Sequence, residues 1–105
     1  MDASLRALAD ATRRQILALV WEDERPAGEI AENFSLTRPA ISQHLSVLLE
    51  SDLISVRQAG TRRLYHANRE ALDHLRAELD AFWEGRLHRL KAGVERAQRR
   101  KRESR

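Results

Sequence analysis

The sequence contains no cysteine, and its 105 residues include only four glycines and two prolines. The absence of cysteine excludes disulfides, thiolate metal sites, iron–sulfur clusters and cysteine nucleophiles. A chain this short, with so few glycines and prolines, has little room for a catalytic cleft, and it contains no glycine-rich phosphate loop. The four histidines are spread over different predicted elements without a nucleophile–base pair, so we expect that the protein is not an enzyme.

Long apolar runs are also missing. No run approaches the roughly 18 residues that suggest a transmembrane helix, and residues 1–4 lack the basic and then apolar pattern of a signal peptide. We therefore expect a cytoplasmic protein without membrane contact. Hydrophobic residues still make up 42% of the chain, which is within the globular range and sufficient for one modest core.

Charge is unevenly distributed along the chain. The formal net charge is +3, with 13 basic and 15 acidic residues in 1–95 but 6 basic and 1 acidic in 96–105. We accordingly divide the chain into a domain of residues 1–95 and a basic C-terminal tail of residues 96–105. We expect the tail to be a solvated, fraying end, with non-specific attraction to DNA as the alternative.

Helical periodicity predicts four helices in the first half of the chain. Leu5 and Leu8 mark a short first helix, and either Asp10 or Thr12 caps the second. Pro26 suits the start of the third helix, because its missing N–H would be unpaired there in any case. Apolar side chains on one side of the second and third helices are Ile16, Leu17, Val20, Trp21, Ile30, Ala31 and Phe34.

The fourth predicted helix begins after Thr37, which is a good N-cap, and runs to about residue 51. Ile41, Leu45 and Leu48 lie at helical spacing and mark its buried face. The period then changes. Residues 54–57 alternate as a half-buried strand does, residues 59–61 supply a turn, and residues 64–66 form a returning strand. Together they predict a small β-hairpin.

A long amphipathic helix is predicted from about residue 69 onward. Its apolar side chains fall within an arc of about 140° at 100° per residue, and they are Leu72, Leu75, Leu79, Phe82, Trp83, Leu87, Leu90, Val94 and Ala97. Such a stripe must be buried against something, and the domain in front of it is small, so we expect a partner subunit. The predicted dimerisation residues are Leu5, Leu8, Leu72, Leu75, Leu79, Phe82, Trp83, Leu87 and Leu90.

The predicted order of elements is α–α–α–α–β–β–α. The fold class is therefore mainly α with a small β-hairpin, and the expected architecture is a dimeric winged helix-turn-helix. In this architecture the second helix of the helix-turn-helix enters the major groove of DNA.

Two segments go beyond a generic winged helix. Residues 8–17 read LADATRRQIL, and residues 36–48 read LTRPAISQHLSVL, continuing through LISVR at 53–57 to Gly60 and Tyr65. Together they closely resemble the ArsR/SmtB family of bacterial dimeric transcriptional repressors. Residues 82–90, FWEGRLHRL, are similar to the last helix of a cysteine-free branch of that family. The resemblance implies a homodimeric repressor of an inverted-repeat operator in double-stranded DNA, with an unknown inducer.

On the fourth helix, polar and small side chains cluster on the face away from the apolar one. Glutamine can pair bidentately with adenine, arginine with guanine, and serine with a base or a phosphate. The resemblance implies that the first four members of the cluster face the major groove, while an ordinary solvated helix face is the alternative. The cluster consists of Arg38, Pro39, Ser42, Gln43 and Ser46.

Arg57, Arg62 and Arg63 flank the tip of the hairpin and complete the predicted DNA-binding set. Arginine at a wing suits phosphate geometry and the potential of a narrow minor groove. The alternative is a solvated loop whose charges protect a sheet edge. Because Arg63 shares its parity with Tyr65, which is expected to point inward, Arg62 is the better candidate for a DNA contact.

Three further side chains have two interpretations each. Arg13 and Arg14 begin the second helix, where positive charge opposes the helix dipole, so either phosphate or an intramolecular partner can be their target. By helical angle His44 lies beside Ile41 and Leu48, which favours a structural role over a base contact.

Many members of the ArsR/SmtB family, which this sequence resembles, sense metals through cysteines on the third helix or through sets of carboxylates and histidines on the last helix. Here residues 29–34 hold no thiol, and the last-helix spacing is not reproduced. Glu84 and His88 could share an ion, but an exposed polar pair at this spacing is far commoner. We predict no metal and no cofactor. A metal-responsive repressor with a non-standard site, and a winged-helix protein-interaction module without DNA binding, are the alternatives.

Overall fold

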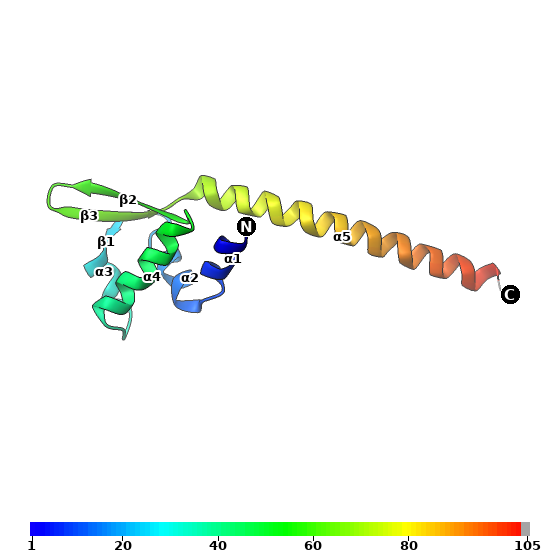
Figure 1. The fold of residues 1–105 in the computed structure, drawn as a ribbon, viewed down its shortest axis with the longest axis horizontal. Coiled ribbons are helices and arrows are strands. Elements are labelled where there is room, and N and C mark those ends of the chain that lie inside the picture. The colour runs from blue at the N-terminus through cyan, green and yellow to red at the C-terminus, as the bar shows by residue number, and fades with distance from the viewer. Residues whose placement is uncertain (104–105) are drawn as a thin grey trace. The chain divides into compact units, whose positions relative to one another are not determined.

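A computed structural model describes residues 1–103 of the chain, and these form two compact units, Met1–Asp73 and the part of His74–Arg105 up to residue 103. Figure 1 shows the elements, which are mostly helical with one small antiparallel sheet, as the sequence predicts. In chain order they are α1 (Asp2–Leu8), α2 (Ala11–Leu19), β1 (Arg25–Pro26), α3 (Ala27–Ala31), α4 (Arg38–Glu50), β2 (Ile54–Ala59), β3 (Arg62–Ala67) and α5 (Arg69–Glu103).

Helix α2 begins at a side-chain cap. The carboxylate of Asp10 accepts a hydrogen bond from the backbone N–H of Arg13 (3.1 Å), so Asp10 rather than Thr12 is the capping residue. This backbone hydrogen bond holds the pKa of Asp10 below its usual value. The predicted apolar side of α2 is buried except for Trp21, which is exposed and carries the Arg69 guanidinium 5.4 Å above its ring.

The helix-turn-helix consists of α3 and α4. Helix α3 is shorter than the apolar spacing suggests, because it ends at Ala31 and leaves Phe34 half-buried in the following turn. Two tight backbone hydrogen bonds, from Asn33 to the carbonyl of Ile30 and from Phe34 to that of Ala31, carry the chain out of the helix.

The sheet has three strands in the order β1-β3-β2, so the prediction of a two-stranded hairpin is incomplete. Pro26 lies at the start of the third helix, as predicted, but it is the N-cap of α3 rather than its first helical residue. It also belongs to β1, where it pairs with Leu64 of β3. β1 is an edge strand, and a residue without an N–H is tolerated at an edge because no ladder bond is lost there. Sequence periodicity could not predict β1, because a strand of only two residues is too short to show a period.

The hydrophobic core lies within the first unit. β2 and β3 place their inward side chains on one face, where Ile54 pairs with Ala67 and Val56 with Tyr65. The buried apolar residues of this unit are Ala7, Ile16, Leu17, Val20, Ile30, Ile41, Leu45, Leu48, Leu53, Ile54, Tyr65 and Ala67. The predicted apolar face of the fourth helix is therefore confirmed as a core face.

Helix α4 ends in a tight reversal that starts the hairpin. Asp52 adopts a left-handed conformation (φ 62°), its N–H donates to the carbonyl of Leu49, and the N–H of Leu53 donates to that of Leu48. This pair of bonds satisfies carbonyls that the end of a helix leaves unpaired. It also turns the chain directly from α4 into the first strand of the wing.

Helix α5 runs for 35 residues and remains helical through the segment predicted to fray. Residues 96–103 of the predicted basic tail continue this helix, while residues 104 and 105 of that tail lie outside the described residues. Among residues 1–103, no helix is both long and apolar enough to cross a membrane.

Candidate nucleic-acid interface

The five residues predicted to read DNA share one exposed face of α4. Opposite them, Ile41, Leu45 and Leu48 are almost completely buried, so the helix is fixed to the core by one side and open on the other. The exposed members are Arg38, Pro39, Ser42, Gln43 and Ser46. The face therefore presents donors and acceptors with no bulky apolar group among them, as close approach to base edges requires.

The first turn of α4 is built to hold this face in place. The backbone N–H of Ala40 donates to the hydroxyl of Thr37 (3.2 Å), which satisfies one of the unpaired donors at the helix start. Pro39 lies within the same turn, where its lack of an N–H costs nothing. The Arg38 guanidinium reaches back over α3, where a methyl group added at Gly28 would lie 3.4 Å from its Nη1 atom.

The wing is the hairpin of β2 and β3. Ala59 pairs with Arg62 across a two-residue turn that starts at Gly60 (φ 63°), a conformation that glycine adopts without strain. Directly opposed residues share a face, so Arg57 lies with Leu64 on the face away from the core, and Arg62 lies on that face too.

Arg63 lies on the other face, as its parity predicts. It shares that face with Tyr65, and its guanidinium lies 5.9 Å above the centre of the Tyr65 ring. No carboxylate within residues 1–103 forms an ion pair with it. All three wing arginines are exposed, but they are held by different partners.

Two wing arginines have carboxylate partners from outside the hairpin. Arg57 donates from Nε to Oε2 of Glu24 (2.7 Å) and from Nη2 to Oε1, which makes a bidentate pair. This side-chain hydrogen bond lowers the pKa of Glu24 and raises that of Arg57 from their usual values. Nη2 of Arg62 lies 3.5 Å from Oε1 of Glu29, in the first turn of α3.

The arginines at the start of α2 have intramolecular partners. Arg13 donates from Nε to the carbonyl of Ala7 (2.7 Å) and from Nη2 to that of Arg6 (3.1 Å), and Arg14 donates to the carbonyl of Leu8 (2.7 Å). Both therefore cap the C-terminal carbonyls of α1. Nη1 of Arg13 also lies 3.4 Å from Nδ1 of His44 on α4, which supports a structural role for that histidine.

In the second unit, the predicted dimerisation stripe of α5 is open. Phe82, Trp83, Leu87 and Leu90 are all exposed, the last by 64%, whereas Leu75 is buried. Phe82 and Trp83 contact each other edge to face, with ring centres 5.5 Å apart. Large apolar groups at this exposure are typical of a surface that has a partner.

Three of the four remaining predicted dimerisation residues lie in the first unit. Leu5 is exposed, whereas Leu8 and Leu72 are half-buried and line an open apolar groove of about 520 Å³ with Leu17 and Trp21. Leu79 of the second unit is also half-buried. The stripe is thus most exposed from residue 82 onward.

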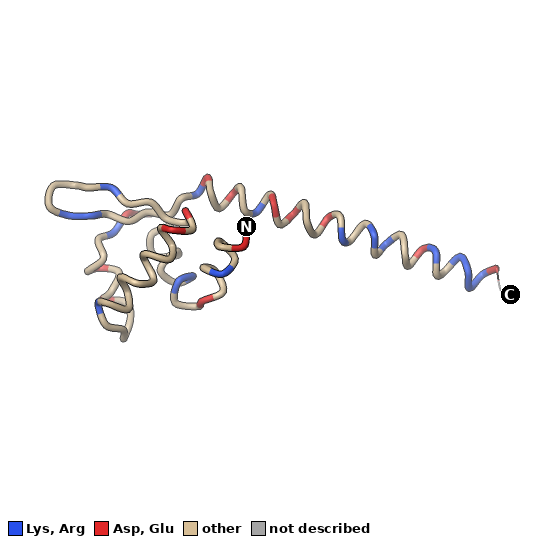
Figure 2. Tube along the Cα trace, in the orientation of Figure 1, with Lys and Arg blue, Asp and Glu red and all other residues tan. Residues whose placement is uncertain are grey.

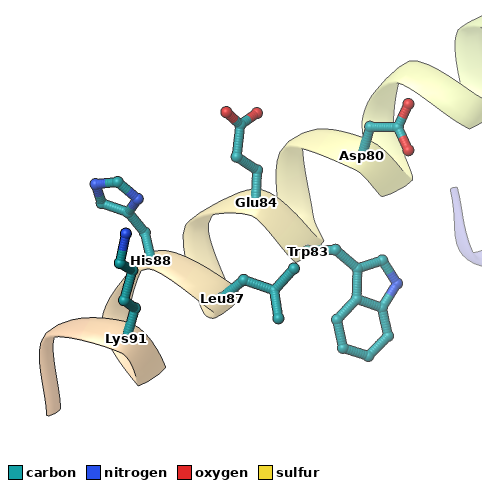
Figure 3. A pocket seen from close by; sticks show the side chains of 6 residues that line it. All are labelled: Asp80, Trp83, Glu84, Leu87, His88 and Lys91. Carbon is teal, nitrogen blue, oxygen red and sulfur yellow. The ribbon is translucent and has the colours of Figure 1, made fainter. Parts of the chain in front are cut away.

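Glu84 and His88, the one pair considered for a metal, lie on the same side of α5 (Figure 3). They line a shallow groove with Asp80, Trp83, Leu87 and Lys91, and the lysine brings a positive charge to it. Within residues 1–103, no three histidine, cysteine, aspartate or glutamate side chains are grouped so that they could hold an ion.

Sequence reasoning missed Glu24 and Glu29 as partners of the wing. Residues 22–26 read as a charged break between helices, so nothing in the pattern brought Glu24 to the hairpin. β1 does so, because its pairing with β3 places the preceding residue beside the sheet. An acidic residue two positions before a proline that can serve as an edge-strand residue was the signal available.

Residues 10–56 match the family model described as "Bacterial regulatory protein, arsR family". The chain is 44% identical over 82 residues to the HTH-type transcriptional regulator Rv2034 of Mycobacterium tuberculosis, covering 78% of this chain and 77% of that protein. It is 33% identical over 80 residues to the arsenical resistance operon repressor of Staphylococcus xylosus, covering 76% and 77%.

A solved structure resembles the fold of this chain over a similar share of its length. It is the homodimeric winged helix-turn-helix DNA-binding domain of Mb0332 from Mycobacterium bovis, described as a possible ArsR-family transcriptional regulator. The TM-score is 0.64 at 29% identity, with 79% of this chain and 77% of that one covered.

Proposed function

Because this chain belongs to the ArsR family of bacterial regulatory proteins, we propose that it represses transcription by binding an inverted-repeat operator in double-stranded DNA as a homodimer. The observation that carries the proposal is the open polar face of α4, fixed to the core by its opposite side. Such a regulator binds DNA in the cytoplasm and has no catalytic task.

Base reading is assigned to α4. Gln43 offers an amide that can pair with the N6 and N7 edge of adenine, and Arg38 offers a fork that matches O6 and N7 of guanine. Ser42 and Ser46 are small enough to let the helix approach and can donate to a base or a phosphate. The wing arginines would lie against the backbone or the minor groove of the flanking DNA.

A homodimer is proposed because the large apolar side chains of the α5 stripe are exposed from residue 82 onward. A similar solved structure is described as homodimeric. A two-fold axis would present two α4 helices to successive major grooves, about 34–36 Å apart. The operator would then be an inverted repeat, since each chain reads the same half-site.

Charge on α5 supports an antiparallel pairing of the two copies. Residues 74–84 hold three acidic and one basic residue, whereas residues 85–103 hold eight basic and two acidic residues. Figure 2 shows this change in charge along the helix. Antiparallel α5 helices would bring the acidic part of each copy near the basic part of the other, which a parallel arrangement would not.

We also propose that the protein acts without a bound metal. Within residues 1–103 no three potential ligands are grouped, and Glu84 and His88 share their groove with Lys91, whose positive charge disfavours a bound cation. Calorimetric titration with Zn²⁺ and Ni²⁺ should detect no stoichiometric, tight binding, and such binding would contradict this part of the proposal.

DNase footprinting on the region upstream of the protein's own gene tests the proposal. We expect protection of an inverted repeat. Arg38→Ala and Gln43→Ala should each weaken operator binding by about 5- to 150-fold per half-site, which corresponds to the 1–3 kcal/mol of one bidentate base contact.

Arg76→Ala and Gln15→Ala are matched controls, because they remove the same side chains from exposed positions on α5 and α2. They should leave operator affinity within about twofold of the parent, as surface substitutions away from a contact do. Equal affinity for the operator in Arg38→Ala, Gln43→Ala and the controls would refute the assignment of α4.

A further inference from the structure

Glu24 forms a bidentate ion pair with Arg57, a predicted DNA contact on the wing. Its carboxylate accepts from both Nε and Nη2 of the guanidinium. Carboxylate and phosphate are recognised by arginine through the same fork of parallel N–H donors. Glu24 therefore occupies one of the two forks of N–H donors through which Arg57 could bind a DNA phosphate, and its charge offsets that of the guanidinium.

We propose that Glu24 is a specificity-determining residue that keeps Arg57 from binding DNA phosphates until operator contacts by α4 bring a phosphate to the wing. The inference rests on the proposed function, because it requires the wing to meet DNA. Glu29 has the same relation to Arg62, through one longer contact of 3.5 Å, and is expected to act more weakly.

The position of Glu24 follows from the sheet. Pro26 and Arg57 both pair with Leu64, on opposite sides of β3, and so they lie in one row across the sheet. Glu24 directly precedes β1, and the pairing of β1 with β3 holds this part of the chain beside the wing. The contact of its carboxylate with Arg57 places the Glu24 side chain on the face that carries Arg57.

The pair is poorly explained as a stabilising feature. The side chain of Arg57 is 61% exposed and that of Glu24 is 32% exposed. Ion pairs at such exposure contribute little to stability, because water and salt screen them. A glutamate is charged at neutral pH at its ordinary pKa, and the side-chain hydrogen bond from Arg57 lowers the pKa of Glu24 further, so Glu24 competes with phosphate as a full negative charge.

The expected consequence differs between two kinds of DNA. On non-specific DNA, affinity comes almost entirely from phosphate contacts. Exchanging the Glu24 carboxylate for a DNA phosphate then adds little binding free energy, because one anion at Arg57 replaces another. On the operator, base contacts by α4 hold the wing beside the backbone, so the exchange can proceed. Glu24 therefore lowers non-specific affinity more than operator affinity.

The test compares Glu24→Gln with the parent in the full-length protein. The glutamine retains a hydrogen-bonding oxygen but removes the charge. Affinity is measured by fluorescence anisotropy over a range of salt concentrations, for the footprinted operator and for a duplex of the same length with scrambled sequence. On scrambled DNA we expect about 3- to 10-fold tighter binding and a salt slope steeper by about two, one phosphate for each of two wings. On the operator the salt slope should stay unchanged.

Glu22→Gln is the matched control. Glu22 lies two residues away, and it also forms an exposed ion pair with an arginine, 3.3 Å from Arg69, which is not on the wing. Glu22→Gln changes the net charge by the same amount as Glu24→Gln but releases no wing arginine. The salt slope of this variant on scrambled DNA should therefore equal that of the parent. In the double variant Glu24→Gln/Arg57→Ala, binding should equal that of Arg57→Ala alone, because the effect of Glu24 runs through Arg57.

The outcomes separate this inference from the proposed function. A parent protein that protects no operator would refute the proposed function. A parent that binds its operator, with Glu24→Gln unchanged on scrambled DNA or indistinguishable from Glu22→Gln, would overturn the inference alone. Weaker binding of Glu24→Gln to both duplexes would also overturn it, since Glu24 would then position Arg57 for DNA rather than withhold it.

Discussion

The two units of this chain satisfy their apolar side chains in different ways. In Met1–Asp73, helices and strands enclose a shared core in which Ile16, Ile41 and Leu48 have no exposed surface. In residues 74–103 a single helix carries its large apolar groups in the open, with Trp83 57% and Leu87 59% exposed. An isolated helix with such a stripe is marginal by itself.

The difference separates the two tasks of the proposed regulator. The first unit has the internal core that holds the recognition face of α4 rigid. The described residues of the second unit, 74–103, form no core of their own, and in the proposed dimer they would acquire one by association. Changes in the first unit should therefore alter unfolding at any protein concentration, whereas changes on the α5 stripe should act through the concentration-dependent association of two chains.

The largest effect is expected in the core of the first unit. Ile41→Ala should lower the free energy of unfolding by about 2–5 kcal/mol, because it leaves a cavity in a closely packed interior. Urea titration at two protein concentrations measures it, and the loss should be similar at both. Leu87→Ala, on the open stripe, should give a loss that varies with protein concentration. Equal, concentration-independent losses would remove the distinction between the units.

A charge on the stripe should prevent association. Leu90→Glu places a carboxylate at a position that the proposed dimer buries, and we expect at least about 100-fold weaker self-association, equivalent to about 3 kcal/mol. Ala92→Glu adds the same charge to the opposite face of α5 and should remain dimeric. Sedimentation equilibrium distinguishes them. A dimeric Leu90→Glu variant would show that the interface lies elsewhere.

The cap of α4 links the core to the recognition face. Thr37→Ala removes the hydroxyl that accepts from the Ala40 N–H, and should cost about 1 kcal/mol of unfolding free energy. Ser46→Ala, at an exposed position in the middle of the same helix, should be neutral or slightly stabilising because alanine favours helix. A loss in both variants would mean that the cap has no special role.

The smallest effect concerns the acid side of the stability profile. Because the pKa of Asp10 is lowered in the folded state, its charged form stabilises α2 at pH values above its unfolded pKa of about 3.9. This contribution is lost as the pH falls through the lower, folded pKa. Asp10→Asn retains a cap without a titrating charge, so unfolding monitored by circular dichroism should depend less on pH below about 4. An unchanged profile would contradict the assignment.

Much of the first unit could be predicted from the sequence. Apolar spacing along α4 identified Ile41, Leu45 and Leu48, and the same spacing placed Gln43 on the open side. Thr37 could be recognised as a cap because threonine before a proline-containing first turn has a definite hydrogen-bonding role. These features depend on neighbours within one or two helical turns.

Features that depend on distant contacts could not be predicted in this way. The strand β1 is two residues long and forms because β3 pairs with it, so the spacing of apolar residues along the sequence does not predict it. Consequently the partner of Arg57 was missed, although Arg57 itself was recognised as a wing residue. The partners of Arg13 were left open for the same reason, since the carbonyls of α1 that it caps become its neighbours only in the folded chain.

The stoichiometry and spacing of the complex with DNA test the account most directly. Hydroxyl-radical footprinting on the upstream region, combined with native mass spectrometry of the complex, measures both. We predict two chains on one inverted repeat, with half-sites centred about 34–36 Å apart along the duplex. A single chain on a single half-site, or protection without sequence preference, would contradict the proposal that a homodimer binds an inverted repeat.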